Sequence, residues 1–264
     1  MTSGALGRIQ AFERSIQQKL AERTVASRWG TFFLNDAFDR IWDLNGLRVM
    51  DPPEAPTAAE LEAEVMRVIG LEGRTPKVYV EDAQVADDLT PGFEALGWSA
   101  TRLETMVLER APAPERVPAP VEEVTWETLR PLVEESTRRQ PYAEDEEDLR
   151  QLVERATLLP RAVAVRYLMA RVDGAPAAYC HLYSDGATAQ VEEVATLAEF
   201  RGRGLARAVI TAAVRRALQD GHDLVFLVAD ADDWPRELYG RLGFESAGRS
   251  CDFYKRPQGK LTSV

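Results

Sequence analysis

The stretch Arg201-Gly202-Arg203-Gly204-Leu205-Ala206 decides the fold of this 264-residue chain. Residues 191–197 before it are rich in β-branched side chains and short enough for a buried strand. Residues 205–218 after it place apolar side chains on one face and polar ones on the other, which predicts an amphipathic helix. A strand, a glycine-rich turn and a helix can bind phosphate, because glycine lets the backbone approach an anion and the first helical turn presents unpaired N–H groups.

The spacing of the glycines separates the known kinds of phosphate loop. A dinucleotide fingerprint requires G-x-G-x-x-G and a Walker loop ends in Gly-Lys-Ser/Thr, and neither is present here. The pattern Arg-x-x-Gly-x-Ala resembles the pyrophosphate signature Gln/Arg-x-x-Gly-x-Gly/Ala of the GNAT acyltransferases. The resemblance implies that Arg201, Gly202, Arg203, Gly204, Leu205 and Ala206 hold the pyrophosphate of coenzyme A. A tight turn without any ligand is the alternative.

A second motif follows downstream. Residues 232–244 resemble the family pattern Asn-x-x-Ala-x-x-Leu-Tyr-x-x-x-Gly-Phe, with Asp232 in place of Asn and Pro235 in place of Ala. A carboxylate at 232 disfavours a phosphate contact, so we do not expect that contact. Over residues 121–256 the expected elements follow the GNAT order of strand, two helices, a three-strand meander, helix, strand, helix and strand. The resemblance implies an α/β (α+β) fold with a mixed, mostly antiparallel central sheet flanked by helices.

The first half of the chain repeats part of the second. Residues 93–98 mirror residues 239–244, and the repeat length indicates a duplicated domain. The helix that corresponds to the phosphate-loop helix is preceded by residues 54–59, which contain no Gly and no Arg. We therefore expect two GNAT-like domains in tandem: residues 1–110 without a CoA loop, a proline-rich linker at 111–120, a catalytic domain at 121–256 and a tail at 257–264.

Composition excludes several classes of protein. The net charge of −11, from 43 acids and 32 bases, argues against a nucleic-acid binder. Two cysteines and two histidines provide neither a disulfide framework nor a metal site, so no metal is expected. No apolar run approaches the roughly 20 residues of a membrane span. The N-terminus lacks the pattern of a signal peptide, and we expect a cytoplasmic protein.

The family resemblance implies transfer of an acetyl group from acetyl-CoA to a primary amine. It also implies that the backbone of Val194, Ala195 and Thr196 pairs with the pantetheine arm, and that Tyr239 acts as the general acid at the CoA sulfur. The alternative for Tyr239 is a ring packed in the core. A base is needed because the amine must be neutral before it attacks.

Candidates for that base come from neighbouring strands. Alternation along a strand places Glu192 on the face of Val194 and Thr196 and Glu193 on the other face, which makes Glu192 the first candidate. A plain surface charge is the competing interpretation. His181 is a second candidate, although a structural histidine fits it better. Cys180 has no basic partner placed by spacing and is expected in the core.

The sequence therefore predicts an N-acetyltransferase with a small-molecule or peptide amine as acceptor. The rival prediction is a non-catalytic CoA-binding or protein-interaction module on the same fold, since a fold alone does not fix a function. The chain is expected as a monomer, with its two halves forming a pseudo-dimer, or as a homodimer.

Overall fold

The computed structural model describes residues 2–50, 52, 54–69, 75–112, 119–232 and 235–255. The chain divides into two compact units. The first unit takes residues 1–12, 105–229 and 233–247, and the second takes residues 13–104, 230–232 and 248–264. Each unit therefore draws on both halves of the sequence. Residues 113–118 of the predicted linker and the whole predicted tail lie outside the described residues.

The first unit contains a sheet with the strand order β10-β9-β8-β7-β6. Every neighbouring pair in it is antiparallel except β9 and β10, which are parallel. Its strands and helices are β6 (Val121–Val124), α4 (Trp126–Arg138), α5 (Glu146–Glu154), β7 (Ala164–Val172), β8 (Ala175–Asp185), β9 (Thr188–Thr196), α6 (Leu205–Gln219), β10 (Leu224–Asp230) and α7 (Pro235–Arg241). The meander β7-β8-β9 confirms the three predicted strands.

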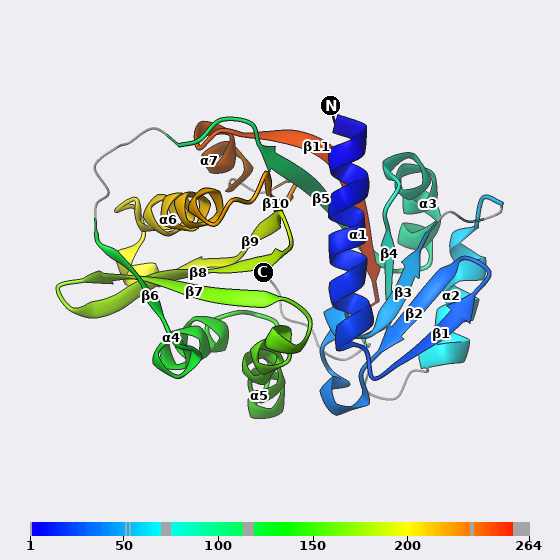
Figure 1. The fold of residues 1–264 in the computed structure, drawn as a ribbon. Helices are drawn as coiled ribbons and strands as arrows, with labels where there is room; N and C mark the ends of the chain where they lie inside the picture. Colours follow the sequence, from blue (N-terminus) through cyan, green and yellow to red (C-terminus); the bar gives the residue numbers. More distant parts are fainter. Residues whose placement is uncertain are drawn as a thin grey trace. The chain divides into compact units, whose positions relative to one another are not determined.

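The two faces of this sheet are covered by different helices (Figure 1). Alternate residues of β7 point to opposite faces: Tyr167 and Met169 pack with α4, whereas Leu168 and Ala170 join the core beneath α6. The β7–β8 turn is Asp173-Gly174, a dipeptide typical of hairpin turns, and both residues have positive φ. In the β8–β9 connection Asp185 pairs with Thr188, so Gly186 and Ala187 form the turn.

The second unit contains strands in the order β1-β2-β3-β4-β11, in which only the β3–β4 pair is parallel. Its elements are the last residues of α1 (Thr2–Leu20), then β1 (Arg23–Ser27), β2 (Gly30–Leu34), β3 (Gly46–Val49), α2 (Ala58–Ile69), β4 (Lys77–Val80) and α3 (Ala83–Ala95). Phe93 of α3 stacks on Phe253 at 4.3 Å between ring centroids, within a core that also holds Trp29 and Phe32.

The strands β5 (Ser99–Leu108) and β11 (Phe244–Tyr254) each contribute residues to both units. The predicted repeat is visible in the elements before them, since β4-α3 precedes β5 as β10-α7 precedes β11. Gly97 and Gly243 end the two helices with positive φ values of 77° and 95°, a conformation that favours glycine. None of the helices in the described ranges is long and apolar enough to cross a membrane.

Candidate functional site

The predicted phosphate loop lies between β9 and α6 in the first unit. Gly202 and Gly204 are both left-handed, with φ values of 74° and 75°, and residues 201–204 are exposed. Gly204 is the N-cap residue of α6 and supplies no side-chain cap. Because the first turn of a helix lacks intrahelical acceptors for its N–H groups, this turn can receive an anion.

The two arginines of the loop are held beside it. Arg201 donates a hydrogen bond to the Thr196 carbonyl at 3.3 Å, and Arg203 donates to the Glu199 carbonyl at 3.4 Å. The Arg203 guanidinium also lies 5.5 Å from the ring centroid of Phe200. These contacts hold the two guanidinium groups against residues 196–200, which precede the loop.

The corresponding helix of the second unit begins differently. The Glu60 carboxylate accepts hydrogen bonds from the Thr57 N–H at 3.0 Å and the Thr57 hydroxyl at 2.8 Å, and Glu60 N–H donates to Thr57 Oγ1 at 3.3 Å. This reciprocal pair is a capping box. A carboxylate therefore already lies at the start of α2 (Ala58–Ile69).

Strand β9 contains a bulge beside the predicted pantetheine segment. Tyr179 of β8 pairs with Ala195 and His181 pairs with Glu192, so Glu193 and Val194 together lie opposite Cys180 alone. Glu193 has a φ of 52°, in the left-handed region. The alternation that was expected to place Glu192 and Glu193 on opposite faces is interrupted here.

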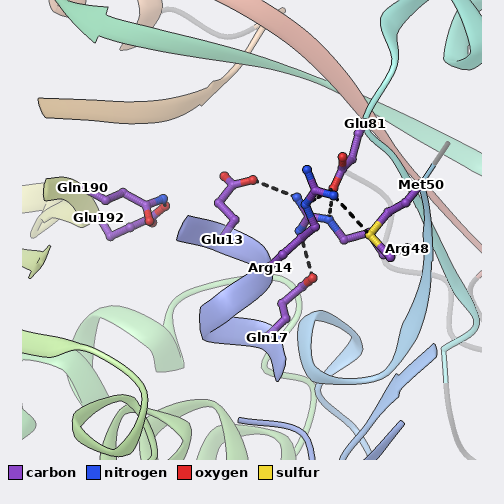
Figure 2. Close-up of polar contacts among 8 residues, drawn as sticks. All are labelled: Glu13, Arg14, Gln17, Arg48, Met50, Glu81, Gln190 and Glu192. Atoms are coloured by element: carbon purple, nitrogen blue, oxygen red, sulfur yellow. Dashed lines mark hydrogen bonds and ion pairs between the residues drawn. The ribbon is translucent and has the colours of Figure 1, made fainter. Parts of the chain in front are cut away.

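The negative charges of Glu192 and Glu193 both affect the buried phenol of Tyr183. Burial raises the pKa of the Tyr183 phenol well above its ordinary value, and the nearby charges of Glu193 and Glu192 raise that pKa further. Glu192 is held by the Gln190 side-chain amide at 2.5 Å, as Figure 2 shows, and by the backbone N–H of Glu193 at 3.2 Å. The first base candidate, Glu192, is thus a fixed carboxylate, and Glu193 is a further candidate beside Glu192 and His181.

Glu193 forms an ion pair with Arg155. Arg155 Nη2 lies 2.5 Å from Glu193 Oε1, and the two side chains are 27% and 34% exposed. Arg155 stands at the end of α5, at the start of the 3-10 turn Arg155–Thr157. No local pattern indicates this partner, which is 38 residues away along the chain.

Three tyrosine rings surround His181. The ring centroids of Tyr167, Tyr179 and Tyr183 lie 5.0, 5.8 and 6.0 Å from that of the imidazole. Burial lowers the pKa of His181 to about 4, against the opposing charge of Glu193, so the ring is neutral at pH 7. The alternation Tyr179-x-His181-x-Tyr183 in the sequence is the signal that could have identified this cluster.

Two buried polar atoms of this region have no hydrogen-bond partner among the residues that the structure describes. His181 Nδ1 lies 3.3 Å from the Tyr183 hydroxyl, but Nε2 has no partner. Thr196 Oγ1, within the predicted pantetheine segment, has none either. Buried polar groups are usually paired, so such atoms indicate a ligand or ordered water. The orphaned Thr196 hydroxyl and the uncapped α6 are features that coenzyme A would satisfy.

The remaining candidates are buried. Tyr239 of α7 belongs to the same hydrophobic core cluster as Leu205, the first residue of α6, and its ring lies 6.4 Å from that of Phe244. Cys180 is completely buried, as predicted, and burial raises the pKa of its thiol. Within the described ranges, no group of three or more His, Cys, Asp or Glu could hold a metal ion.

Comparisons with known proteins identify the family of this region. Residues 126–244 match the acetyltransferase (GNAT) family. A mycothiol acetyltransferase from Corynebacterium aurimucosum is 36% identical over 76 residues, which is 28% of this chain. The chain covers only 25% of that relative's length.

Solved structures share the fold at low sequence identity. A GCN5-related N-acetyltransferase from Kribbella flavida has a TM-score of 0.66 and 18% identity, over 97% of each chain. A tandem GNAT protein from the clavulanic acid biosynthesis pathway has a TM-score of 0.53 and 17% identity, over 77% of this chain and 70% of that one. These likenesses concern the fold, whereas the match over residues 126–244 concerns the family. Residues 126–244, with their strand, glycine loop and helix in the expected order, therefore match the acetyltransferase (GNAT) family.

Proposed function

We propose that the chain is an acetyl-CoA-dependent N-acetyltransferase that acts on a primary amine, with its active site in the first unit. The observation that carries this proposal is the exposed loop with two left-handed glycines that opens onto the uncapped N-terminus of α6. A pyrophosphate can accept hydrogen bonds from this helical turn and meet the charges of Arg201 and Arg203.

Strand β9 supports the proposal from the other side of the loop. The backbone of Val194, Ala195 and Thr196 would hold the pantetheine arm, and the bulge at Glu193 interrupts the β8–β9 ladder where that segment begins. Acetyl-CoA, when bound, supplies the activated acetyl group. The chain's own residues then have to take a proton from the amine and give one to the departing sulfur.

Carboxylates and a phenol are available for these two tasks. Glu192 and Glu193 are both partly exposed at the bulge and can accept a proton from the acceptor. Tyr239 is the proposed proton donor to the sulfur. The packing of the Tyr239 ring among core residues fits a structural role as well. A structural Tyr239 would favour the rival proposal, in which the domain binds CoA without transferring an acetyl group.

Calorimetric titration of acetyl-CoA tests the loop first. Gly204→Glu places a carboxylate and a strained left-handed residue at the α6 N-cap, so we expect affinity to fall by at least about 100-fold. Gly186→Glu is the matched control, since Gly186 is also left-handed but lies in the β8–β9 turn. Binding of one equivalent that only the first variant loses supports the proposal. Absence of binding to the unmodified chain would overturn it.

Turnover separates the enzyme from the rival. Thiol release from acetyl-CoA is measured with a panel of primary amines, for the unmodified chain and for Tyr239→Phe. Loss of turnover with unchanged acetyl-CoA affinity supports catalysis by Tyr239. A chain that binds acetyl-CoA and acetylates no amine would instead be the non-catalytic module.

A further inference from the structure

We infer that the acceptor of this enzyme carries a carboxylate next to its amine, as a free amino acid does, and that Arg155 and Glu193 determine this specificity. The inference rests on the proposed function and names the substrate class of the same site. It starts from an ion pair that the phosphate loop and the proposed proton donor do not use.

Glu193 lies next to the segment that is proposed to hold the acetyl donor. Glu193 immediately precedes the proposed pantetheine segment Val194, Ala195 and Thr196, and it sits in the β9 bulge. A positive φ is unfavourable for a glutamate, so the surrounding structure has to impose it. Conformations of this kind collect at ligand sites. An amine bound to this carboxylate would lie beside the strand that holds the acetyl donor.

A second observation points to a ligand in the same place. His181 is 2% exposed, and its Nε2 lacks a partner among the described residues, while Glu193 and Arg155 both act electrostatically on its ring. A neutral imidazole nitrogen can donate or accept one hydrogen bond, depending on its tautomer. The first unit thus contains a carboxylate paired with a guanidinium, and a buried histidine with one unsatisfied nitrogen that is flanked by three tyrosine rings.

The charges of Arg155 and Glu193 favour a zwitterionic acceptor over a simple amine. The Arg155–Glu193 pair is neutral as a whole. A simple ammonium would compete with Arg155 for Glu193 and break this ion pair, which is unfavourable at a partly buried position. A zwitterion replaces one ion pair with two, its ammonium meeting Glu193 and its carboxylate meeting Arg155. The planar guanidinium suits a carboxylate because it can form two parallel hydrogen bonds.

The chemical step balances with these groups. The bound ammonium loses one proton to a base, and its nitrogen forms a bond to the acetyl carbonyl carbon. The carbon–sulfur bond of the thioester breaks, and the sulfur leaves as a thiol after it takes a second proton. The products are an N-acetyl amino acid, free coenzyme A and one released proton. Arg155 takes no part in bond making and acts as a specificity-determining residue.

Matched acceptors test the inference. Each of a panel of free amino acids is compared with its own amide, which keeps the amine and the side chain but lacks the carboxylate. The unmodified chain should favour the acid over the amide by at least about tenfold in kcat/KM, mainly through KM. Arg155→Gln should bring that ratio near one. Arg150→Gln is the control, because Arg150 is an exposed arginine of α5 that pairs with Glu147 and Glu154.

The outcomes separate this inference from the proposed function. Equal turnover of acids and amides by the unmodified chain overturns the inference and leaves the N-acetyltransferase intact. A chain that binds acetyl-CoA but acetylates neither class overturns both. Should Arg155→Gln fail to fold, Arg155→Lys decides, because lysine keeps the charge but cannot form two parallel bonds. A preference for the acid that Arg155→Lys leaves unchanged also overturns the inference.

Discussion

Arg48 of the second unit holds three side chains at once, and its removal gives a measurable prediction. It donates to Glu13 at 3.0 Å and to Gln17 at 2.8 Å, and it also pairs with Glu81 (Figure 2). Its guanidinium lies 4.4 Å from the ring centroid of Tyr79. The Arg48 side chain is only 4% exposed, and those of Glu13 and Glu81 are 18% and 10% exposed.

Arg48→Met keeps an apolar side chain of similar length but removes the charge. Two carboxylates then remain in the interior without their main partner, so the free energy of unfolding should fall by about 3–5 kcal/mol. Arg67→Met is the control, because Arg67 is 63% exposed and pairs with Glu64 three residues away on the same helix. An exposed pair of this kind contributes about 0–1 kcal/mol.

Urea unfolding followed by tryptophan fluorescence measures both variants, since Trp29 is buried in the core of the second unit. Burial raises the pKa of Glu13, so protonation of this group relieves part of the unpaired charge. The loss caused by Arg48→Met should therefore be smaller near pH 5 than near pH 8. A loss within about 1 kcal/mol of the Arg67→Met value at both pH values would refute the reasoning.

Three further predictions concern the first unit. The lowered pKa of His181, about 4 against an ordinary 6.5, means that the folded state binds fewer protons, so up to about 3 kcal/mol of stability is lost as pH falls from about 6.5 to about 4. His181→Gln should flatten this part of the pH profile in urea unfolding, and a slope that persists contradicts the assignment. Gly243→Ala should lower the melting temperature, because its Cβ would meet the Arg110 carbonyl at 2.1 Å with φ at 95°. Gly240→Ala, in open space on α7, should leave that temperature unchanged or raise it slightly. Tyr239→Phe should abolish turnover and retain the calorimetric affinity for acetyl-CoA; equal turnover removes Tyr239 from the mechanism.

Local sequence signals predicted much of the first unit correctly. Asp173-Gly174 forms its turn because both positions need positive φ, and α6 begins at Leu205, directly after the second glycine of the loop. In the second unit, the Thr57–Glu60 capping box is likewise formed by residues three apart. In each case the residues that fix the geometry are neighbours in the chain, so their chemistry can be read without a fold.

The parts that were missed depend on distant pairing. A period of two along residues 188–196 places Glu193 on the face opposite Glu192, because it contains no sign of the inserted residue that interrupts the alternation. Arg155 approaches Glu193 only because α5 and β9 belong to the same unit. The division of β5 and β11 between two units likewise depends on which strands they join, a choice that their own sequences do not contain.

The two helix starts explain why one acetyl-CoA per chain is the expected stoichiometry. At α6 the N-cap residue is a glycine without a side chain, and the helical N–H groups remain open for a ligand's negative charge. At α2 that position is taken by Thr57 and the carboxylate of Glu60, whose pKa is lowered by its hydrogen bonds with Thr57. The Glu60 carboxylate thus stabilises the N-terminus of α2. Glu60→Gln would remove the charge but not the capping geometry, so calorimetry on that variant should still find one equivalent of acetyl-CoA. A second equivalent would mean that the Glu60 carboxylate alone blocks a complete site.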